Sequence, residues 1–337
     1  MKVVSTGGGF NEGDIILACD DKSITTLLED TVFKFRGSGI TPRENAAAPW
    51  LFTQHGNPFV DAPISCQVVG DDSARRLEWS SIDSSGWRSG APGQQKWGGQ
   101  FEYINHNDVA WIKLPSFNNR VATQLQALYS QVESDLDKLR TAPLVILDVR
   151  GNGGGNSQWG VKFSQLIWSP QYVEAYRRSS ASSVEWRVSE DNAAHVESFG
   201  RLNLAQTMRA SIPDGGALLR QDIPQRQPSR DIDAPLTGNV IVLMDSACVS
   251  ACLDFLDLLS SFEGISFVGE ETSADTNYIE VRRTFLPGYR FRAVIPIKVY
   301  RDRIRPDGGS YSPTIHFPND LDRGSDKAVL DWLRTIN

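Results

Sequence analysis

Strand-like and helix-like segments alternate along most of this 337-residue chain. Short apolar runs rich in Val, Ile and Leu predict strands, and longer runs with apolar residues three and four apart predict helices. The strand-like runs span residues 108–117, 143–149, 238–245 and 265–271, and the helix-like runs between them span residues 120–140, 157–167 and 250–262. Strands separated by such helices need crossover connections, which place the strands parallel. The sequence therefore predicts an α/β core built on a mainly parallel sheet.

Three consecutive glycines follow the second predicted strand, in the stretch "VILDVRGNGGG" that ends at Gly155. Glycine adopts positive φ freely and lets another group approach the backbone closely, so such a cluster is typical of a phosphate cradle or an oxyanion site. A Walker P-loop requires GxxxxGK[ST] and a dinucleotide loop requires GxGxxG, and this stretch satisfies neither pattern. The cluster therefore favours an oxyanion site.

Ser250 lies at a comparable place, between the predicted strand 238–245 and the apolar helix that follows it. Chemistry in open α/β sheets gathers at the carboxyl ends of the strands. As an N-cap, the serine hydroxyl would accept hydrogen bonds from amides of the first helical turn. As a nucleophile, it would use those amides to stabilise a tetrahedral oxyanion, at roughly 3 to 4 kcal/mol per donor. The glycine cluster fits the second interpretation, because both strand ends would then meet at one site.

The chain is long enough for two domains, and its pattern changes near residue 100. Residues 1–85 have the pattern of strands and loops with one helical segment, and residues 86–100 are rich in Gly, Ser, Pro and Gln, as in a linker. We expect a small β-rich domain over 1–85, in which "DIILAC" pairs with the strands around "SCQVV" and "RRLEW" and an insertion over 37–62 projects away. The core then spans 101–337. Within it, the polar residues 170–235 are expected to be irregular and to cover a cleft.

Composition narrows the possible partners. The formal net charge is −7, and no basic stripe of the kind that binds phosphates is visible, so nucleic acid is not an expected partner. No run of about 18 apolar residues predicts a membrane span, and the first residues lack the apolar core of a signal peptide. The cysteine spacing offers no zinc site, and neither metal nor cofactor is expected. One interpretation is that all four cysteines are small buried hydrophobic residues. The alternative is that Cys19 and Cys66, which lie in two strand-like runs, form a disulfide.

Four segments together carry a resemblance to a known family. In chain order they are "VAWIKLPSF", "LVILDVRGNGGG", "GNVIVLMDSACVSACLDF" and "FVGEETSADTNY". The series is similar to the ordered motifs of the S41 serine peptidases, the family of the C-terminal processing (tail-specific) proteases and the tricorn core. The resemblance spans about residues 100–320 and implies a ClpP/crotonase-like core. "GFNEGDIILACDD" resembles a strand and turn of the PDZ-like module that often precedes this core, so residues 1–85 resemble a partial PDZ-like domain.

The resemblance assigns roles to the two strand ends. Ser250 matches the family's nucleophile, and the amide of Ala251 would be one oxyanion donor. The amide of Gly154 or Gly155 would be the other, and bare backbone there lets an N–H group point into the site. Cys252 is a rival nucleophile, although its place two residues into the helix favours packing.

The general base is where the sequence departs from the family. Processing proteases carry a lysine in a "GKG" segment, and Asp275 of "GEETSADT" stands at that position here. The tricorn branch uses a histidine ahead of the "VAWIKLPSF" strand with a carboxylate late in the core, and His106 and Asp307 match these places. Lys298 is a second candidate, since a strand from that part of the family's core passes near the site. We expect His106 to be the base and rank Lys298 second. The alternatives are that His106 is a loop histidine without a catalytic role and that Lys298 is a surface lysine.

The resemblance therefore implies a serine peptidase that acts on peptide or protein substrates. Asp275, Thr276 and Tyr278 are expected to line its site and to hold the base or a water. The alternative is a catalytically inactive S41-like protein that binds peptides or hydrophobic ligands, which the missing lysine favours. The persistence of Ser250 and the glycine loop favours the enzyme. The resemblance also implies a periplasmic or secreted location, with any signal peptide already removed.

Overall fold

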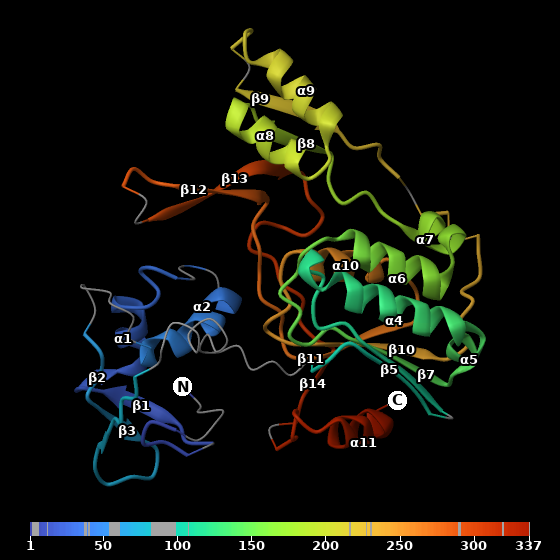
Figure 1. The fold of residues 1–337 in the computed structure, drawn as a ribbon. Coiled ribbons are helices and arrows are strands. Elements are labelled where there is room, and N and C mark those ends of the chain that lie inside the picture. Colours follow the sequence, from blue (N-terminus) through green and yellow to red (C-terminus); the bar gives the residue numbers. More distant parts are fainter. Residues whose placement is uncertain are drawn as a thin grey trace.

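The described residues of the chain form three β-sheets (Figure 1). The computed structural model describes residues 1, 7–11, 13–36, 39, 41–53, 61–81, 99–106, 108–215, 217–226, 228–229, 231–288, 291–318 and 320–336. The expected linker 86–100 lies almost entirely outside the described residues. No helix within these ranges is long and apolar enough to cross a membrane.

The central sheet has six strands in the order β14-β11-β10-β7-β6-β5. Their bounds are β5 Glu102–His106, β6 Val109–Lys113, β7 Leu144–Asp148, β10 Asn239–Met244, β11 Ile265–Gly269 and β14 Ile315–His316. All neighbours pair in parallel except β5, which is antiparallel to β6. The predicted mainly parallel α/β sheet is confirmed.

Helices cover both faces of this sheet. Their bounds are η2 Asn119–Val121, α4 Ala122–Ser134, α5 Leu136–Thr141, α6 Gln158–Trp168, α7 Pro170–Tyr176, α10 Ala251–Leu259 and α11 Asp326–Ile336. Helices α4, α5, α6 and α10 lie on one face and α11 on the other (Figure 1). Side chains alternate along a strand, so in β7 Val145 and Leu147 pack under the first group while Leu144 and Ile146 pack against α11. Strand β7 is therefore buried on both sides.

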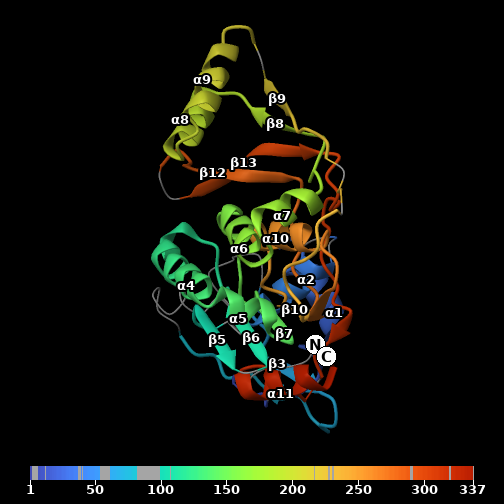
Figure 2. The same ribbon diagram turned by 90° about the vertical axis from the view of Figure 1, so that its right-hand side faces the viewer.

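A second sheet lies beyond the α6/α10 layer (Figure 2) and has the antiparallel order β12-β13-β8-β9. Its elements are β8 Ser183–Arg187, α8 Glu190–Ser198, α9 Leu202–Ser211, β9 Leu218–Asp222, β12 Tyr278–Phe285 and β13 Arg292–Arg301. The prediction that residues 170–235 are irregular is therefore wrong. Strand β8 pairs with β13, far along the chain, and a polar composition gives no sign of such a distant pairing.

The N-terminal module forms its own small sheet, β2-β1-β3-β4. Its elements are β1 Ile16–Cys19, β2 Lys22–Ser23, α1 Ile24–Asp30, α2 Thr41–Ala47, η1 Ala48–Phe52, β3 Ser65–Val68 and β4 Arg75–Arg76. As expected, β1 pairs with β3, and β3 pairs with β4. Residues 37–62 do not simply project away, because Ala47 and Leu51 are buried in the core of the module. A PDZ-like identity and the domain boundaries stay predictions.

Candidate active site

The glycine loop and the loop that carries Ser250 leave the central sheet at the same edge. They follow β7 and β10, which are parallel neighbours with Leu243 opposite Asp148. The carboxyl ends of adjacent parallel strands place the following loops side by side. The two motifs that the sequence singled out are therefore brought together.

Ser250 has an uncommon backbone conformation, with φ 59° and ψ −121°. Non-glycine residues in such regions carry strain of about 1 to 3 kcal/mol and cluster at functional sites. Its side chain is exposed and makes no capping hydrogen bond to α10. The N-cap interpretation is therefore wrong, and the hydroxyl lies at the start of a helix without a backbone partner.

Gly154 packs directly against this turn. A Cβ atom placed on Gly154, whose φ is +85°, would lie 2.9 Å from Ser250 Cβ, 2.6 Å from Val249 O and 3.0 Å from Ala251 N. The distance to the Val249 oxygen is shorter than any van der Waals contact allows. Only glycine lets the two loops approach this closely, and the expected proximity of Gly154 and Ser250 is confirmed.

Three backbone amides around Ser250 differ in their engagement. Gly154 N donates a 2.9 Å hydrogen bond to Asn152 Oδ1. Among the hydrogen bonds of the described residues, none uses the amide of Ala251 or that of Gly155. Gly155 is held in place instead by its neighbours, since Phe117 N donates to Gly154 O and Asn156 N donates to Phe117 O. In the described part of the chain, the amides of Ala251 and Gly155 are thus unbonded, whereas that of Gly154 is bound to Asn152.

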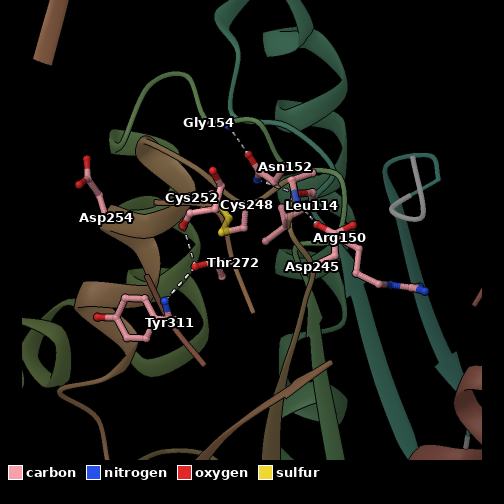
Figure 3. The surroundings of a disulfide bond; sticks show 12 residues. Leu114, Arg150, Asn152, Gly154, Asp245, Cys248, Cys252, Asp254, Thr272 and Tyr311 are labelled. Atoms are coloured by element: carbon pink, nitrogen blue, oxygen red, sulfur yellow. Dashed lines mark hydrogen bonds between the residues drawn. A yellow bond between two sulfur atoms is a disulfide. The ribbon is translucent and has the colours of Figure 1, made fainter. Parts of the chain in front are cut away.

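Asn152 is the central link between the loops, and Figure 3 shows it between Gly154 and Leu114. It is fully buried, and its Nδ2 donates to Leu114 O at 2.8 Å. Its backbone carbonyl accepts a long 3.4 Å bond from Val249 N. Every polar group of this side chain that lies inside the protein is thus satisfied, as burial requires. Asn152 was not expected from the sequence, because a lone Asn between glycines has the appearance of an ordinary turn residue.

Asp245 joins the same two loops through hydrogen bonds to its carboxylate. Its carboxylate accepts hydrogen bonds from Gly151 N at 2.9 and 3.0 Å and from Ala247 N at 3.0 Å. Burial raises the pKa of Asp245 to about 6, and the two backbone donors oppose that rise. The nearby Asp148 and Arg150 form a buried ion pair, and Arg150 also donates to Arg323 O at 2.8 Å. The "DxR" part of the motif therefore anchors the loop and does not face the site.

A disulfide joins Cys248 to Cys252 (Figure 3). Ser250 lies midway between these two cysteines in the sequence and therefore within the ring that the bond closes. A disulfide also joins Cys19 to Cys66, which confirms the pairing that the sequence left open. The view of Cys248 and Cys252 as free buried hydrophobes is wrong, and Cys252 has no thiol with which to act as a nucleophile. Their spacing, four residues apart at a helix start, was the signal that could have indicated this bond.

A comparison of the sequence with models of known protein families identifies the family of this chain. The family model described as "Peptidase family S41" matches residues 108–303, more than half of the chain and including both loops. The chain belongs to peptidase family S41. No curated protein sequence matches this chain.

Solved structures with similar folds have low sequence identity to this S41 chain. Mature CPAF is 13% identical with a TM-score of 0.57, and 99% of this chain and 78% of CPAF are covered. CPAF complexed with lactacystin is 12% identical with a TM-score of 0.54, over 98% of this chain and 78% of that one. The photosystem II D1 C-terminal processing protease gives 12% identity and a TM-score of 0.34, over 95% and 69%. The likeness to CPAF shows the shared fold.

His106 lies at the opposite end of the central strands from the loop that carries Ser250. It pairs with Val109, which pairs with Leu144 at the start of β7. The glycine loop begins beyond the far end of that strand, roughly 13 Å away along a strand that rises about 3.3 Å per residue. The prediction that His106 is the base is therefore wrong in this structure. The histidine ends an antiparallel edge strand, whose direction the sequence analysis did not determine.

Lys298 has the electrostatic character expected of a base. It lies on β13 with its Nζ 5.1 Å from the Trp186 ring centre and 4.8 Å from that of Tyr300. Burial lowers the pKa of Lys298 to about 8, although Glu280 and Asp254 oppose the change. Asp254 belongs to the first turn of α10, and its amide donates to Ser250 O. Lys298 thus lies within electrostatic range of the helix that carries Ser250.

The remaining candidates support loops. Asp275 pairs with Arg305 and Arg303, two buried arginines that also bind Asp254 and Asp257 of α10. The carboxylate at the family's lysine position is therefore engaged in an ion-pair network, which the sequence analysis missed. Thr276 Oγ1 bonds to the backbone of Tyr278, whose side chain is exposed, and Asp307 accepts from Asn277 N. Within the described ranges, no cluster of His, Cys, Asp or Glu could hold a metal.

The glycine loop provides a matched pair of substitutions. Gly154→Ala should lower the free energy of unfolding by about 2 kcal/mol or more, because the new Cβ meets Val249 O and the backbone is at positive φ. Gly153→Ala is the control, since a Cβ there meets nothing within 4 Å. Urea unfolding measures both. Equal stabilities of the two variants would refute the close packing of the loops.

The buried Asp245 predicts a pH dependence of stability. Its folded pKa of about 6 lies above the ordinary 3.8, so the native state holds the proton more tightly than the unfolded state. This contribution is complete below about pH 4 and is lost as pH rises through about 6. Asp245→Asn removes it. The stability of the wild type relative to this variant should fall by about 3 kcal/mol between about pH 4 and about pH 7 in urea unfolding. A constant difference would contradict the burial of an ionisable group.

Proposed function

We propose that this chain is a serine peptidase that hydrolyses peptide bonds with Ser250 as its nucleophile. The observation that carries the proposal is the conformation of Ser250: an exposed hydroxyl at positive φ, free of any capping bond, at the start of α10. Sharp, strained strand-to-helix turns expose the nucleophile in other serine hydrolases. Membership of family S41 supports peptide or protein substrates.

The amides that surround Ser250 suit an acyl-transfer reaction. Ser250 Oγ would attack the carbonyl carbon of the scissile bond, and the carbonyl oxygen would become an oxyanion that accepts hydrogen bonds from Ala251 N and Gly155 N. The helix dipole of α10 adds positive potential at the same end. The intermediate would then collapse, the amine would leave with a proton from the base, and water would hydrolyse the acyl-enzyme. Donors placed in advance stabilise the developing charge.

Lys298 is the base that we propose among the described residues. A lysine must be neutral to accept the serine proton, and a lowered pKa makes this form available near neutral pH. The aromatic rings of Trp186 and Tyr300 and the burial that lowers its pKa supply that environment. Asp307 and Asp275 have other partners, so we propose no catalytic role for them.

A second candidate function is binding without cleavage. Among the described residues no side chain hydrogen-bonds to Ser250 Oγ, so the activated pair of a typical serine hydrolase is not formed in this state. The same fold would then present the exposed serine turn as part of a peptide-binding surface. Chemical labelling of Ser250 separates the two functions.

The two disulfides bear on location. Disulfides form and persist in oxidising compartments, and Cys19–Cys66 and Cys248–Cys252 are both bonded. We propose that the protein works outside the cytoplasm, in the periplasm or after secretion.

Labelling with a fluorophosphonate tests the proposed nucleophile. The wild type should be labelled at Ser250, and Ser250→Ala should abolish labelling and lower peptide hydrolysis by about 10,000-fold or more. Ser246→Ala in the same loop is the control and should keep both activities. Mass spectrometry of the labelled peptide locates the adduct. A wild type that neither reacts nor cleaves any peptide in a diverse library would support binding without catalysis.

The pH profile tests the proposed base. With Lys298 as the base, kcat/KM should rise with pH around a midpoint of about 8, because only the neutral amine accepts a proton. Lys298→Ala should slow labelling about 100-fold or more. Lys298→Arg should not restore it, since a guanidinium does not lose its proton in proteins. The exposed Lys327→Ala is the control. Full activity in Lys298→Ala would assign the base to another group.

A further inference from the structure

The turn that carries Ser250 lacks the glycines that usually permit such a conformation. In the nucleophile elbow of α/β-hydrolases, the residues two before and two after the serine are glycines, which make room for the sharp turn. Here those two positions are Cys248 and Cys252, both fully buried and bonded to each other. The strained residue therefore sits at the centre of a covalent ring closed by the disulfide.

The hydrogen bonds of the turn hold its flanks and leave its centre unbound. Cys248 N donates to Asp245 O at 3.1 Å, and Cys252 N donates to Val249 O at 3.2 Å. On the far side, Asp254 N donates to Ser250 O at 3.0 Å. Within the described chain, neither Ser250 Oγ nor Ala251 N takes part in a hydrogen bond. Because no hydrogen bond within the turn holds either group, another element has to fix their directions.

Packing constrains the turn from one side only. Gly154 lies against Ser250 Cβ and Ala251 N, but Ser250 is exposed on its other side. Strained residues persist only where the surroundings over-determine them. The disulfide is the one covalent link that spans the turn in the described structure, and it joins the loop before Ser250 to the first turn of α10.

We propose that the Cys248–Cys252 disulfide is a positioning element, which holds the Ser250 backbone in its strained conformation and directs the Ala251 amide toward the oxyanion. This inference rests on the proposed function of Ser250 as nucleophile. It assigns no redox step to the enzyme: the bond is structural, and both sulfurs are buried in the α6/α10 core. The cysteines take no part in the chemistry themselves.

The second disulfide supplies a matched control. Cys19–Cys66 lies in the small N-terminal sheet, where the two residues are paired across β1 and β3. Removing either disulfide takes away a cross-link and two buried sulfurs, so losses of general stability occur in both variants. Only removal of Cys248–Cys252 should change the reactivity of Ser250.

The experiment compares the wild-type chain with Cys248→Ala/Cys252→Ala and with Cys19→Ala/Cys66→Ala. The rate of Ser250 labelling by a fluorophosphonate should fall at least about 10-fold in the first variant, in line with the effect of a small misplacement of reacting groups, and should stay at the wild-type value in the second. The single variants Cys248→Ala and Cys252→Ala should each match their double variant, because each breaks the same bond. Additive losses would indicate packing alone and overturn the proposal, as would a wild-type labelling rate in the double variant.

Hydrogen–deuterium exchange provides a readout that does not depend on catalysis. The peptide that covers Ser250 and Ala251 should exchange faster without the Cys248–Cys252 bond, and at the wild-type rate without Cys19–Cys66. If the wild type is not labelled, the proposed function fails and the exchange result still decides whether the bond holds the turn. If the alanine pair does not fold, Cys248→Val/Cys252→Ala restores much of the buried volume and is measured in its place. Unchanged exchange at the turn would overturn the proposal.

Discussion

The candidate site depends on one close contact, that of Gly154 with the turn at Ser250. The space between these loops does not admit even a Cβ atom, since one on Gly154 would lie 2.6 Å from Val249 O. The parallel pairing of β7 and β10 brings the two loops to one edge of the sheet, and the absence of a side chain lets them meet. In this arrangement Gly154 N is bound to Asn152. Among the described hydrogen bonds, none uses the amides of Ala251 and Gly155.

Buried polar groups then hold the two loops in register. Asn152 binds the end of β6 and the glycine loop, and Asp245 binds the amides of both loops. Leaving a buried donor or acceptor unpaired costs about 1 to 3 kcal/mol, so movement of either loop would break several such bonds at once. The ion pair of Asp148 and Arg150 extends this support to the C-terminal segment through Arg323 O. Hydrogen bonds as well as packing therefore hold the two loops together.

The sequence was sufficient for the parallel core, because apolar runs and helical spacing in alternation leave few topologies. It also singled out Ser250 and the glycine loop, which the structure brings together, because their residue types are tied to backbone conformation. It failed where a property depends on distant pairing. His106 was misplaced because the antiparallel direction of β5 is not encoded locally, and residues 170–235 were taken as irregular because β8 finds its partner in β13. Asn152 and Cys248–Cys252 were missed because single polar or sulfur-containing residues in a turn have many ordinary roles.

The most direct test of the account is a crystal structure of the protein after reaction with a fluorophosphonate. The account predicts a phosphorus atom bonded to Ser250 Oγ, with a phosphoryl oxygen about 2.7 to 3.1 Å from both Ala251 N and Gly155 N. The bond from Gly154 N to Asn152 should be retained. A phosphoryl oxygen directed to solvent, or one bound by Gly154 N in place of Gly155 N, would contradict the assignment of the oxyanion site.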